Sequence, residues 1–388
     1  YRTGMFGKNH LFRDYQLPEI WDTLDERLVA NGEGVEGRDK AFSAVTLDPA
    51  HPFNITERLT SGAMEFMAQK SDKPFLCWIN YQDPHPLFMA PEPYANLFPP
   101  NEVTLPKSYF ADESTLPYRC RVWRDHSEME TCSEEDAKKA IAMYMGQIRY
   151  VDDMVGRLHR ALEEGGILEN TVVVFMSDHG ELLGDFKMFH KLPVFYDSLT
   201  RIPLIVRTPD RLWKTQKVRS LVEEVDLAPT FLELLGQPVP HSMVGRSFHT
   251  SLVKGADEGK ESVLCQAGFG APTWKKSDPN LKLKAPFPPT AYGPGAMIRK
   301  GAFKLSYYAD DLCQLFNLEE DPLEMKNLFE NERFRGIRLE LQEELLKRLL
   351  SVKTRDIGRL DWVETSRDYM IDPRSQPLES WFKGMPEK

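Results

Sequence analysis

Short apolar runs that end in polar residues alternate with amphipathic segments along the first 245 residues. The run from Phe75 to Asn80 (FLCWIN) is followed by polar residues and prolines, which predicts a buried strand and then a loop. Residues 172–176 are apolar and rich in valine without alternation, as expected for a parallel strand covered on both faces. A further strand is predicted over 202–207, before a helix over 226–235. This alternation predicts an α/β domain with a mostly parallel central sheet flanked by helices.

A long helix is predicted between residues 134 and 164. Ser133 with Asp136 three residues later forms a capping-box-like start, and Gly165-Gly166 forms the end. The apolar positions between them recur at spacings of three and four: Ile141, Tyr144, Ile148, Val151, Val155, Leu158 and Leu162. This periodicity predicts one apolar face that packs into the core.

The pattern changes beyond about residue 250. The stretches ESVLCQAG, AMIRKGAFKLSYY and LCQLFNLEEDP predict short strands joined by turns, and Phe334 to Leu350 predicts a closing helix. A chain of 388 residues exceeds what one hydrophobic core usually organises. We therefore predict a catalytic α/β domain over residues 1–245 and a smaller C-terminal subdomain over 246–388, with an antiparallel sheet and a packed helix.

The composition excludes several classes of function. Hydrophobic residues at 41% and charged residues at 28% are typical of a globular protein. The net charge of −10, with no basic stripe to offset it, argues against a nucleic-acid partner. No apolar run reaches the roughly 18 residues of a membrane span. An anionic substrate would therefore need a local cationic pocket within an acidic chain.

The five cysteines do not form a recognisable framework. They are Cys77, Cys120, Cys132, Cys265 and Cys313, an odd set without a CxxC pair. This pattern argues against a disulfide framework and against a structural zinc site. Cys77 lies within FLCWIN and is predicted to be buried core.

Residues with metal-binding and acid–base chemistry follow the predicted strands. His85 follows the strand at 75–80, and Asp178 and His179 follow the strand at 172–176. Ligands of parallel α/β sheets gather at the carboxyl ends of strands, so we expect these side chains near one another. An oxygen donor beside a nitrogen donor can bind one metal ion. Taken alone, Asp178 and His179 equally fit a turn aspartate beside a surface histidine.

Three motifs occur in order: GKNH at residues 7–10, NYQDPHP at 80–86 and SDHGELLGDFKMFHKLPVFYDSLTRIPLIV at 177–206. With them, and with QLFNLEEDPLEMKNL near its C-terminal end, the chain resembles the type I, formylglycine-dependent sulfatases of the alkaline phosphatase superfamily from Tyr1 to about Leu328. The resemblance implies an alkaline-phosphatase-like α/β sandwich. It also implies a hydrolase that acts on sulfuric esters.

The resemblance assigns roles to four residues that match the family motifs. Asp178 falls on the metal-ligand aspartate, and His179 falls where many relatives have Asn and a subset has His. Lys8 matches the lysine that bridges sulfate and nucleophile, and Lys191 matches the second sulfate-binding lysine. Two lysines and a divalent cation in a water-poor cleft stabilise the charge that develops on the sulfate oxygens. They would form the cationic pocket that the acidic chain needs.

The resemblance also assigns roles to histidines. His10 matches the histidine that orients and deprotonates the nucleophile, and His85 matches the histidine near the scissile oxygen. His190, beside Lys191, either lines the substrate pocket or packs locally, and the sequence leaves both readings open. Asp83 is expected to shape the loop that carries His85 and not to bind metal.

The nucleophile motif of the family, C/S-x-P-S/A-R, is not found in the printed sequence. The family also has an Asp-Asp pair of metal ligands, and both features precede its GKxH motif. We therefore expect residues 1–388 to be the C-terminal portion of a sulfatase-like enzyme, with formylglycine upstream of Tyr1 in a missing N-terminal segment. The first strand of the parallel sheet would be missing with it, which would leave an exposed edge.

Three hypotheses of function remain. The leading one is a sulfatase that cleaves a sulfate monoester of a small molecule or saccharide, with Ca²⁺ as the metal. The second is a phosphonate monoester or phosphodiester hydrolase of the same superfamily, because the nitrogen of His179 suits Mn²⁺ or Zn²⁺ better than Ca²⁺. The third is a catalytically inactive relative that serves as a binding protein. The sequence leaves the exact substrate, the compartment and the oligomeric state open.

Overall fold

The computed structural model describes most of the chain: residues 1–9, 16–25, 40–51, 54–209, 217–254, 259–267, 293–309 and 311–355. The chain divides into two compact units, each built from two segments. The first comprises Tyr1–Thr215 with Cys265–Arg335, and the second comprises Gln216–Leu264 with Gly336–Lys388. Both units draw on segments from each side of residue 245, so the predicted domain boundary stays a prediction.

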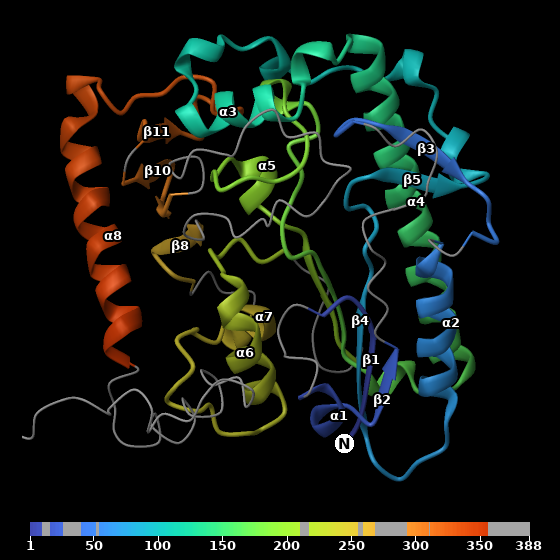
Figure 1. Cartoon of the computed structure of the whole chain (residues 1–388). Helices are drawn as coiled ribbons and strands as arrows, with labels where there is room; N and C mark the ends of the chain where they lie inside the picture. Colours follow the sequence, from blue (N-terminus) through green and yellow to red (C-terminus); the bar gives the residue numbers. More distant parts are fainter. Residues whose placement is uncertain are drawn as a thin grey trace, which may run out of the picture. The chain divides into compact units, whose positions relative to one another are not determined.

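A parallel sheet carries the first motif and the strand predicted at 75–80. Its strand order is β2 (Thr23–Asp25), β1 (Arg2–Gly7) and β4 (Phe75–Asn80), with all neighbours parallel (Figure 1). The register pairs Gly7 with Asn80, so β1 and β4 end level with each other. Short helix α1 (Leu17–Ile20) lies between β1 and β2 in sequence. The carboxyl ends of β1 and β4 therefore deliver Lys8 and the His85 loop to one edge of the sheet.

Helix α2 (Ile55–Ala68) supplies the core beneath this sheet. Its apolar side contributes Leu59 and Phe66, which are almost fully buried, to a cluster that includes Phe6 of β1. Complete burial of such side chains contributes about 1.5–3 kcal/mol each. This packing explains why β1 carries small and apolar residues along RTGMFG.

The remaining strands of the α/β part form two pairs. β3 (Ala44–Leu47) pairs with β5 (Phe88–Pro91) in parallel, and β6 (Val173–Met176) pairs with β7 (Leu204–Arg207) in antiparallel orientation. The sequence predicts a parallel strand at 172–176. This prediction is wrong for the pairing with β7, the partner found among the described residues. All four residues of β6 are only half-buried, so the predicted cover on both faces is incomplete within the part of the chain that the structure describes.

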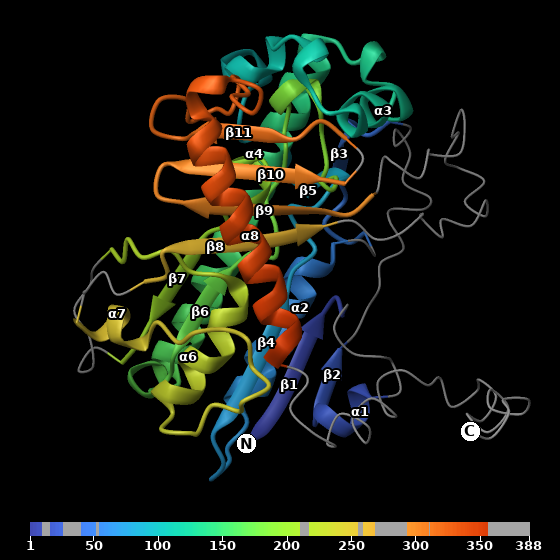
Figure 2. The same cartoon turned by 90° about the vertical axis from the view of Figure 1, so that its left-hand side faces the viewer.

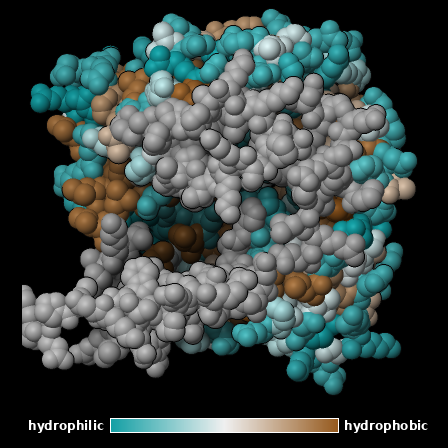
Figure 3. All heavy atoms as spheres, viewed as in Figure 1, coloured by the Kyte–Doolittle hydropathy of each residue, from teal (hydrophilic) through white to brown (hydrophobic). Residues whose placement is uncertain are grey.

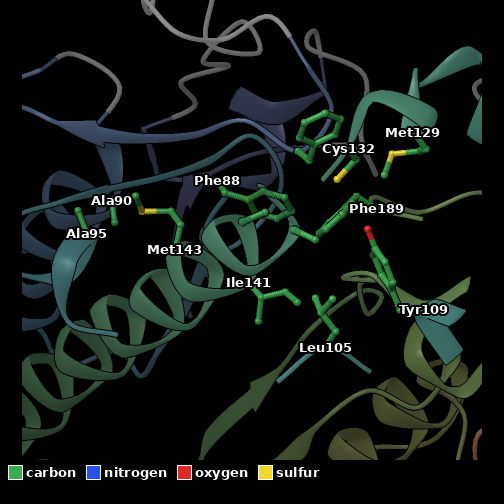
Figure 4. Packing of buried hydrophobic residues seen from close by; sticks show 13 residues of the cluster. Phe88, Ala90, Ala95, Leu105, Tyr109, Met129, Cys132, Ile141, Met143 and Phe189 are labelled. Carbon is green, nitrogen blue, oxygen red and sulfur yellow. The ribbon is translucent and has the colours of Figure 1, made fainter. Parts of the chain in front are cut away.

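Helix α4 (Glu134–Glu164) has the predicted bounds and caps. Ser133 and Asp136 form a capping box. Its buried face includes Ile141 and Met143, which pack with Phe88, Phe189 and other residues of one cluster (Figure 4). The predicted face is wrong at Ile148, which is 48% exposed, because Gln147 takes the buried position beside it.

The first unit also contains the C-terminal antiparallel sheet. Its strands are β11 (Gln314–Asn317), β10 (Phe303–Tyr308), β9 (Gly295–Lys300) and β8 (Ser262–Ala267), in that spatial order (Figure 2). The division between the units falls within β8. Helices α3 (Tyr118–His126) and α5 (Asp197–Thr200) precede this sheet in sequence. The mixed α/β fold with a parallel sheet and a C-terminal antiparallel sheet confirms the predicted fold class.

A buried lysine ties α5 to this antiparallel sheet. Lys304 of β10 is fully buried, and its Nζ lies 2.6 Å from Asp197 Oδ1 at the first residue of α5. Glu324 forms an ion pair with the same Lys304 and accepts a hydrogen bond from Asp197 N. Because a buried charge is stable only when it is paired, this triad fixes α5 in place.

The second unit contains α6 (Leu227–Leu234), α7 (His249–Lys254) and the helix α8 (Arg335–Arg355) from Gly336 onward. Helices α6 and α8 match the predicted segments at 226–235 and 334–350, whereas α7 was not predicted. Helix α8 has three exposed leucines: Leu339, Leu346 and Leu350. Hydrophobic side chains also reach the surface elsewhere on the molecule, as the brown patches among the hydrophilic residues in Figure 3 show. Within the described ranges, no helix is both long and apolar enough to cross a membrane.

Candidate active site

The turn after β1 requires glycine and fixes the position of Lys8. Gly7 has a φ of +108°, and a Cβ there would lie 2.1 Å from the carbonyl oxygen of Asn80. Lys8 N donates to that carbonyl over 3.3 Å, and Asn80 Nδ2 donates to Lys8 O over 2.6 Å. The end of β4 thus holds the backbone of the half-buried Lys8 from both sides. Asn80 is the first residue of the motif NYQDPHP, which assigned it no role.

A buried network holds the loop that carries His85. Asp83 accepts hydrogen bonds from Thr56 Oγ1 of α2 (2.6 Å) and from Gln147 Nε2 of α4 (3.0 Å). These contacts agree with the expectation that Asp83 shapes the loop. Thr56 and Gln147 were missed, although a glutamine on the apolar face of a helix is a signal that could have revealed the network.

His85 is held as a neutral imidazole. Its Nδ1 lies 2.5 Å from the carbonyl oxygen of Pro86, which can only accept, so Nδ1 carries the proton. Loss of hydration lowers the pKa of His85 to about 4, and the charges of Lys8 and Lys191 contribute, while the hydrogen bond to Pro86 opposes them. Nε2 is therefore left as an unprotonated acceptor.

Asp178 and His179 follow β6 and face His85. The His179 and His85 rings meet edge to face, with centroids 6.1 Å apart. His179 Nδ1 donates to the carbonyl oxygen of Gly180 (2.7 Å), which leaves Nε2 unprotonated; its lone pair accepts from Lys191 Nζ (2.6 Å) and could bind a metal only in place of that contact. The side chain of Asp178 is 85% exposed, and its Oδ2 lies 3.7 Å from His179 Nε2. The pair thus presents one oxygen and one nitrogen donor from the same strand end.

The cation site is incomplete in the part of the chain that is described. Sulfatases generally use a divalent metal and formylglycine. Asp178 and His179 offer suitable donor atoms, but no cluster of three or more His, Cys, Asp or Glu residues that could hold a metal occurs within the described ranges. Two donors are too few for a tight site of a hard cation, so these residues alone do not fit the metal.

Lys191, from the middle of the third motif, lies beside His179. Its Nζ lies 2.6 Å from His179 Nε2. Loss of hydration lowers the pKa of this exposed lysine and repulsion from Lys8 adds to the shift, whereas Asp178 and Glu181 oppose it. The charge of Lys8 thus acts on Lys191, and the cationic pocket that the two lysines would form stays a prediction.

Two further predicted residues differ in outcome. His190 Nε2 lies 2.8 Å from the carbonyl oxygen of Ala41, and the ring packs against Phe88 and Trp123 with centroid distances of 6.4 Å and 6.2 Å. These contacts favour the reading in which His190 packs locally. His10 lies outside the described residues, so its role stays a prediction.

Glu181 is a second motif residue whose role was missed. Its Oε1 accepts hydrogen bonds from the backbone amides of Leu183 (3.2 Å) and His190. Loss of hydration raises the pKa of this carboxyl to about 7, while these amides and Lys191 oppose the shift. In the sequence, the only signal for a role of Glu181 was its position directly after Asp178-His179-Gly180.

The comparisons with known proteins concern the family and the fold of the chain. The family model described as Sulfatase matches residues 1–237. The uncharacterized sulfatase YidJ of Escherichia coli (strain K12) is 27% identical over 368 residues, which cover 89% of this chain and 68% of YidJ. The chain spans between 48% and 68% of the length of the first curated relatives.

Two solved structures share the fold. The phosphonate monoester hydrolase of Agrobacterium radiobacter superposes with a TM-score of 0.70 at 21% identity, covering 91% of this chain and 78% of that one. A protein in complex with its substrate D-glucosamine-2-N,6-O-disulfate gives a TM-score of 0.71 at 20% identity, covering 91% and 80%. This likeness shows an alkaline-phosphatase-like fold. Because the family model covers well over half of the chain, the protein belongs to the sulfatase family.

Proposed function

We propose that this chain carries most of the active site of a sulfatase that hydrolyses a sulfate monoester. The observation that supports it best is the contact of 2.6 Å between Lys191 Nζ and His179 Nε2, beside Asp178. Lys191 and the Asp178–His179 pair, which lie 12 residues apart in the third motif, thereby meet at one strand end, and the charge of Lys8 from the GKNH motif also acts on Lys191. Such a constellation binds a tetrahedral anion and stabilises the charge that its oxygens gain during transfer.

Each residue has a separate task in this proposal. Lys8 and Lys191 bind peripheral oxygens of the sulfate, and Lys8 is held in place by Asn80. The Nε2 of His85 is the ring nitrogen left for the substrate, because Nδ1 binds Pro86 O, and Nε2 must first take up a proton before it can donate one to the bridging oxygen. His10 orients the nucleophile. Asp178 and His179 would contribute to holding a divalent cation, which would neutralise negative charge, and formylglycine, if another segment supplies it, would provide the attacking oxygen.

We propose that the nucleophile and the remaining metal ligands come from outside the printed 388 residues. Two features support this: the nucleophile motif is not in the sequence, and Asp178 and His179 alone are too few to bind the metal. Calcium is the metal that we propose, with manganese or zinc as the alternative that the nitrogen of His179 favours.

The substrate that we propose is a sulfated saccharide or another small sulfate ester. The solved complex with a disulfated glucosamine supports this class. A second candidate is hydrolysis of a phosphonate monoester, which the fold of the Agrobacterium enzyme and the nitrogen ligand at His179 favour. Both substrates present an anionic tetrahedral centre to the same lysines.

The direct test compares the complete product of the gene with residues 1–388 expressed alone. We expect the complete product to hydrolyse p-nitrophenyl sulfate and to contain a divalent metal by elemental analysis. We expect the 388-residue chain alone to be inactive and poorly soluble. Full turnover by that chain alone would refute the external nucleophile. A complete product that binds sulfate esters without hydrolysing them would support the inactive binding protein instead.

A further inference from the structure

The segment between the metal-binding pair and Lys191 has an unusual backbone. Four of its residues that carry a Cβ have positive φ: Leu183 (44°), Phe186 (53°), Lys187 (55°) and His190 (69°). Such residues rarely adopt this conformation, and clusters of them occur where a structure constrains a functional site. The loop 182–190 therefore needs contacts that hold it.

The loop closes on itself through backbone hydrogen bonds. Gly184 N donates to Met188 O (2.7 Å), and Lys187 N donates to Gly184 O (3.0 Å). Phe186 stacks on Tyr196 with a centroid distance of 4.3 Å, which anchors the tip of the loop. The base is closed only weakly by backbone contact, because Leu182 N and His190 O are 3.5 Å apart. The base thus depends on a side chain.

That side chain is Glu181. One carboxylate oxygen accepts from the amide of Leu183 at the start of the loop and from the amide of His190 at its end. The backbone of Glu181 is itself fixed, because its amide donates to Ser198 O (3.0 Å). Glu181 lies two residues after His179, and His190 directly precedes Lys191. The carboxylate therefore links the backbone that follows the Asp178–His179 pair to the backbone that directly precedes Lys191.

We propose that Glu181 is a positioning residue that closes the base of loop 182–190 and thereby holds Lys191 against His179. The proposal rests on the proposed function, because it takes Lys191 as a sulfate-binding group. Glu181 itself touches no substrate. It acts by fixing the amide next to Lys191, so that the Lys191 side chain, whose Nζ lies 2.6 Å from His179 Nε2, stays beside His179. A charged donor displaced by about 1 Å from its productive position can lose about 100-fold in rate.

The test uses the complete gene product and the variants Glu181→Ala and Glu181→Gln. Glutamine keeps one oxygen acceptor and should keep most of kcat, whereas alanine should lower kcat about 100-fold. Amide hydrogen exchange of peptides covering 182–191 should accelerate in Glu181→Ala only. A matched control is Asp226→Ala: Asp226 is also a buried carboxylate that accepts two backbone amides, from Glu223 (2.9 Å) and Arg246 (2.7 Å). The Asp226→Ala variant should lower the Tm without changing kcat or the amide exchange of residues 182–191.

A double-mutant cycle with Lys191→Ala separates positioning from general support. If Glu181 acts through Lys191, Glu181→Ala should cost little further kcat once Lys191 is alanine. An equal loss in both backgrounds, at equal metal content, would overturn the proposal, and so would unchanged loop exchange in Glu181→Ala. If Glu181→Ala prevents folding, Glu181→Asp takes its place in the test. A carboxylate shortened by one methylene cannot reach both amides. A wild-type kcat and wild-type amide exchange in Glu181→Asp would therefore also overturn the proposal. A wild-type product that hydrolyses no sulfate ester refutes the proposed function alone, since the exchange measurement still reports on the loop.

Discussion

Replacing Gly180 with alanine tests how the metal-binding pair is held. A Cβ at this position would lie 1.9 Å from the carbonyl oxygen of Ser198, which no real contact allows. The same backbone approach carries two hydrogen bonds, from Gly180 N to Leu199 O (2.8 Å) and from Glu181 N to Ser198 O (3.0 Å). Overpacking costs about 1–3 kcal/mol, and each weakened hydrogen bond costs about 1 kcal/mol. We therefore expect Gly180→Ala to lower the free energy of unfolding by about 3 kcal/mol.

Urea unfolding of the complete gene product measures this loss, with Gly156→Ala as the control. Gly156 lies within α4, and the nearest atom to a Cβ there is the flexible end of Arg160 at 3.7 Å. Alanine should stabilise that helix position by about 0.5–1 kcal/mol. Gly180→Ala should also lower kcat per folded molecule, because α5 can no longer support Asp178 and His179. Equal stability of the two variants would refute the close approach of the 180–181 segment to α5.

Three further predictions concern single side chains. Lys191→Ala should lower kcat/KM by about 10²–10³-fold. Lys70→Ala, at an exposed lysine, should leave kcat/KM unchanged. Steady-state kinetics with an aryl sulfate measure both values. Burial raises the pKa of Asp83, so the folded state keeps this proton to higher pH than the unfolded chain. The contribution of Asp83 to stability therefore falls as pH rises from about 4 through the folded pKa. Asp83→Asn should remove that part of the pH dependence of the free energy of unfolding, as measured by urea titrations. An unchanged pH profile in Asp83→Asn would count against this prediction. Burial raises the pKa of the Cys77 thiol to about 12, so Cys77→Ala should leave kcat intact and cost about 1 kcal/mol of stability; a large loss of turnover would contradict that.

Elements with strong local signals are well predicted by the sequence. The bounds of β4 and α4 agree with the predicted ones at both ends, because caps and prolines act within a few residues. Strand pairing depends on residues distant in sequence, and the antiparallel pairing of β6 with β7 has no local signal. The burial of Gln147 could not be predicted for the same reason, since the hydrogen-bond partner of its side-chain amide, Asp83, lies far away in the sequence.

The candidate site shows the same division. The motifs identify Lys8, Lys191 and the Asp178–His179 pair, and the fold places Lys191 against His179. The residues that support them, Asn80 and Glu181 among them, act through backbone atoms. A side chain that binds a backbone amide leaves no pattern in one sequence. The supporting contacts therefore emerge only from the structure.

The most direct test of the central claim is the ratio of kcat/KM for two substrates of the complete gene product. These are p-nitrophenyl sulfate and p-nitrophenyl phenylphosphonate, which share the leaving group and differ at the tetrahedral centre. Our account predicts that the sulfate ester is hydrolysed with the higher kcat/KM and that Lys191→Ala removes most of this activity. A higher kcat/KM for the phosphonate would contradict the assignment as a sulfatase and support the phosphonate hydrolase.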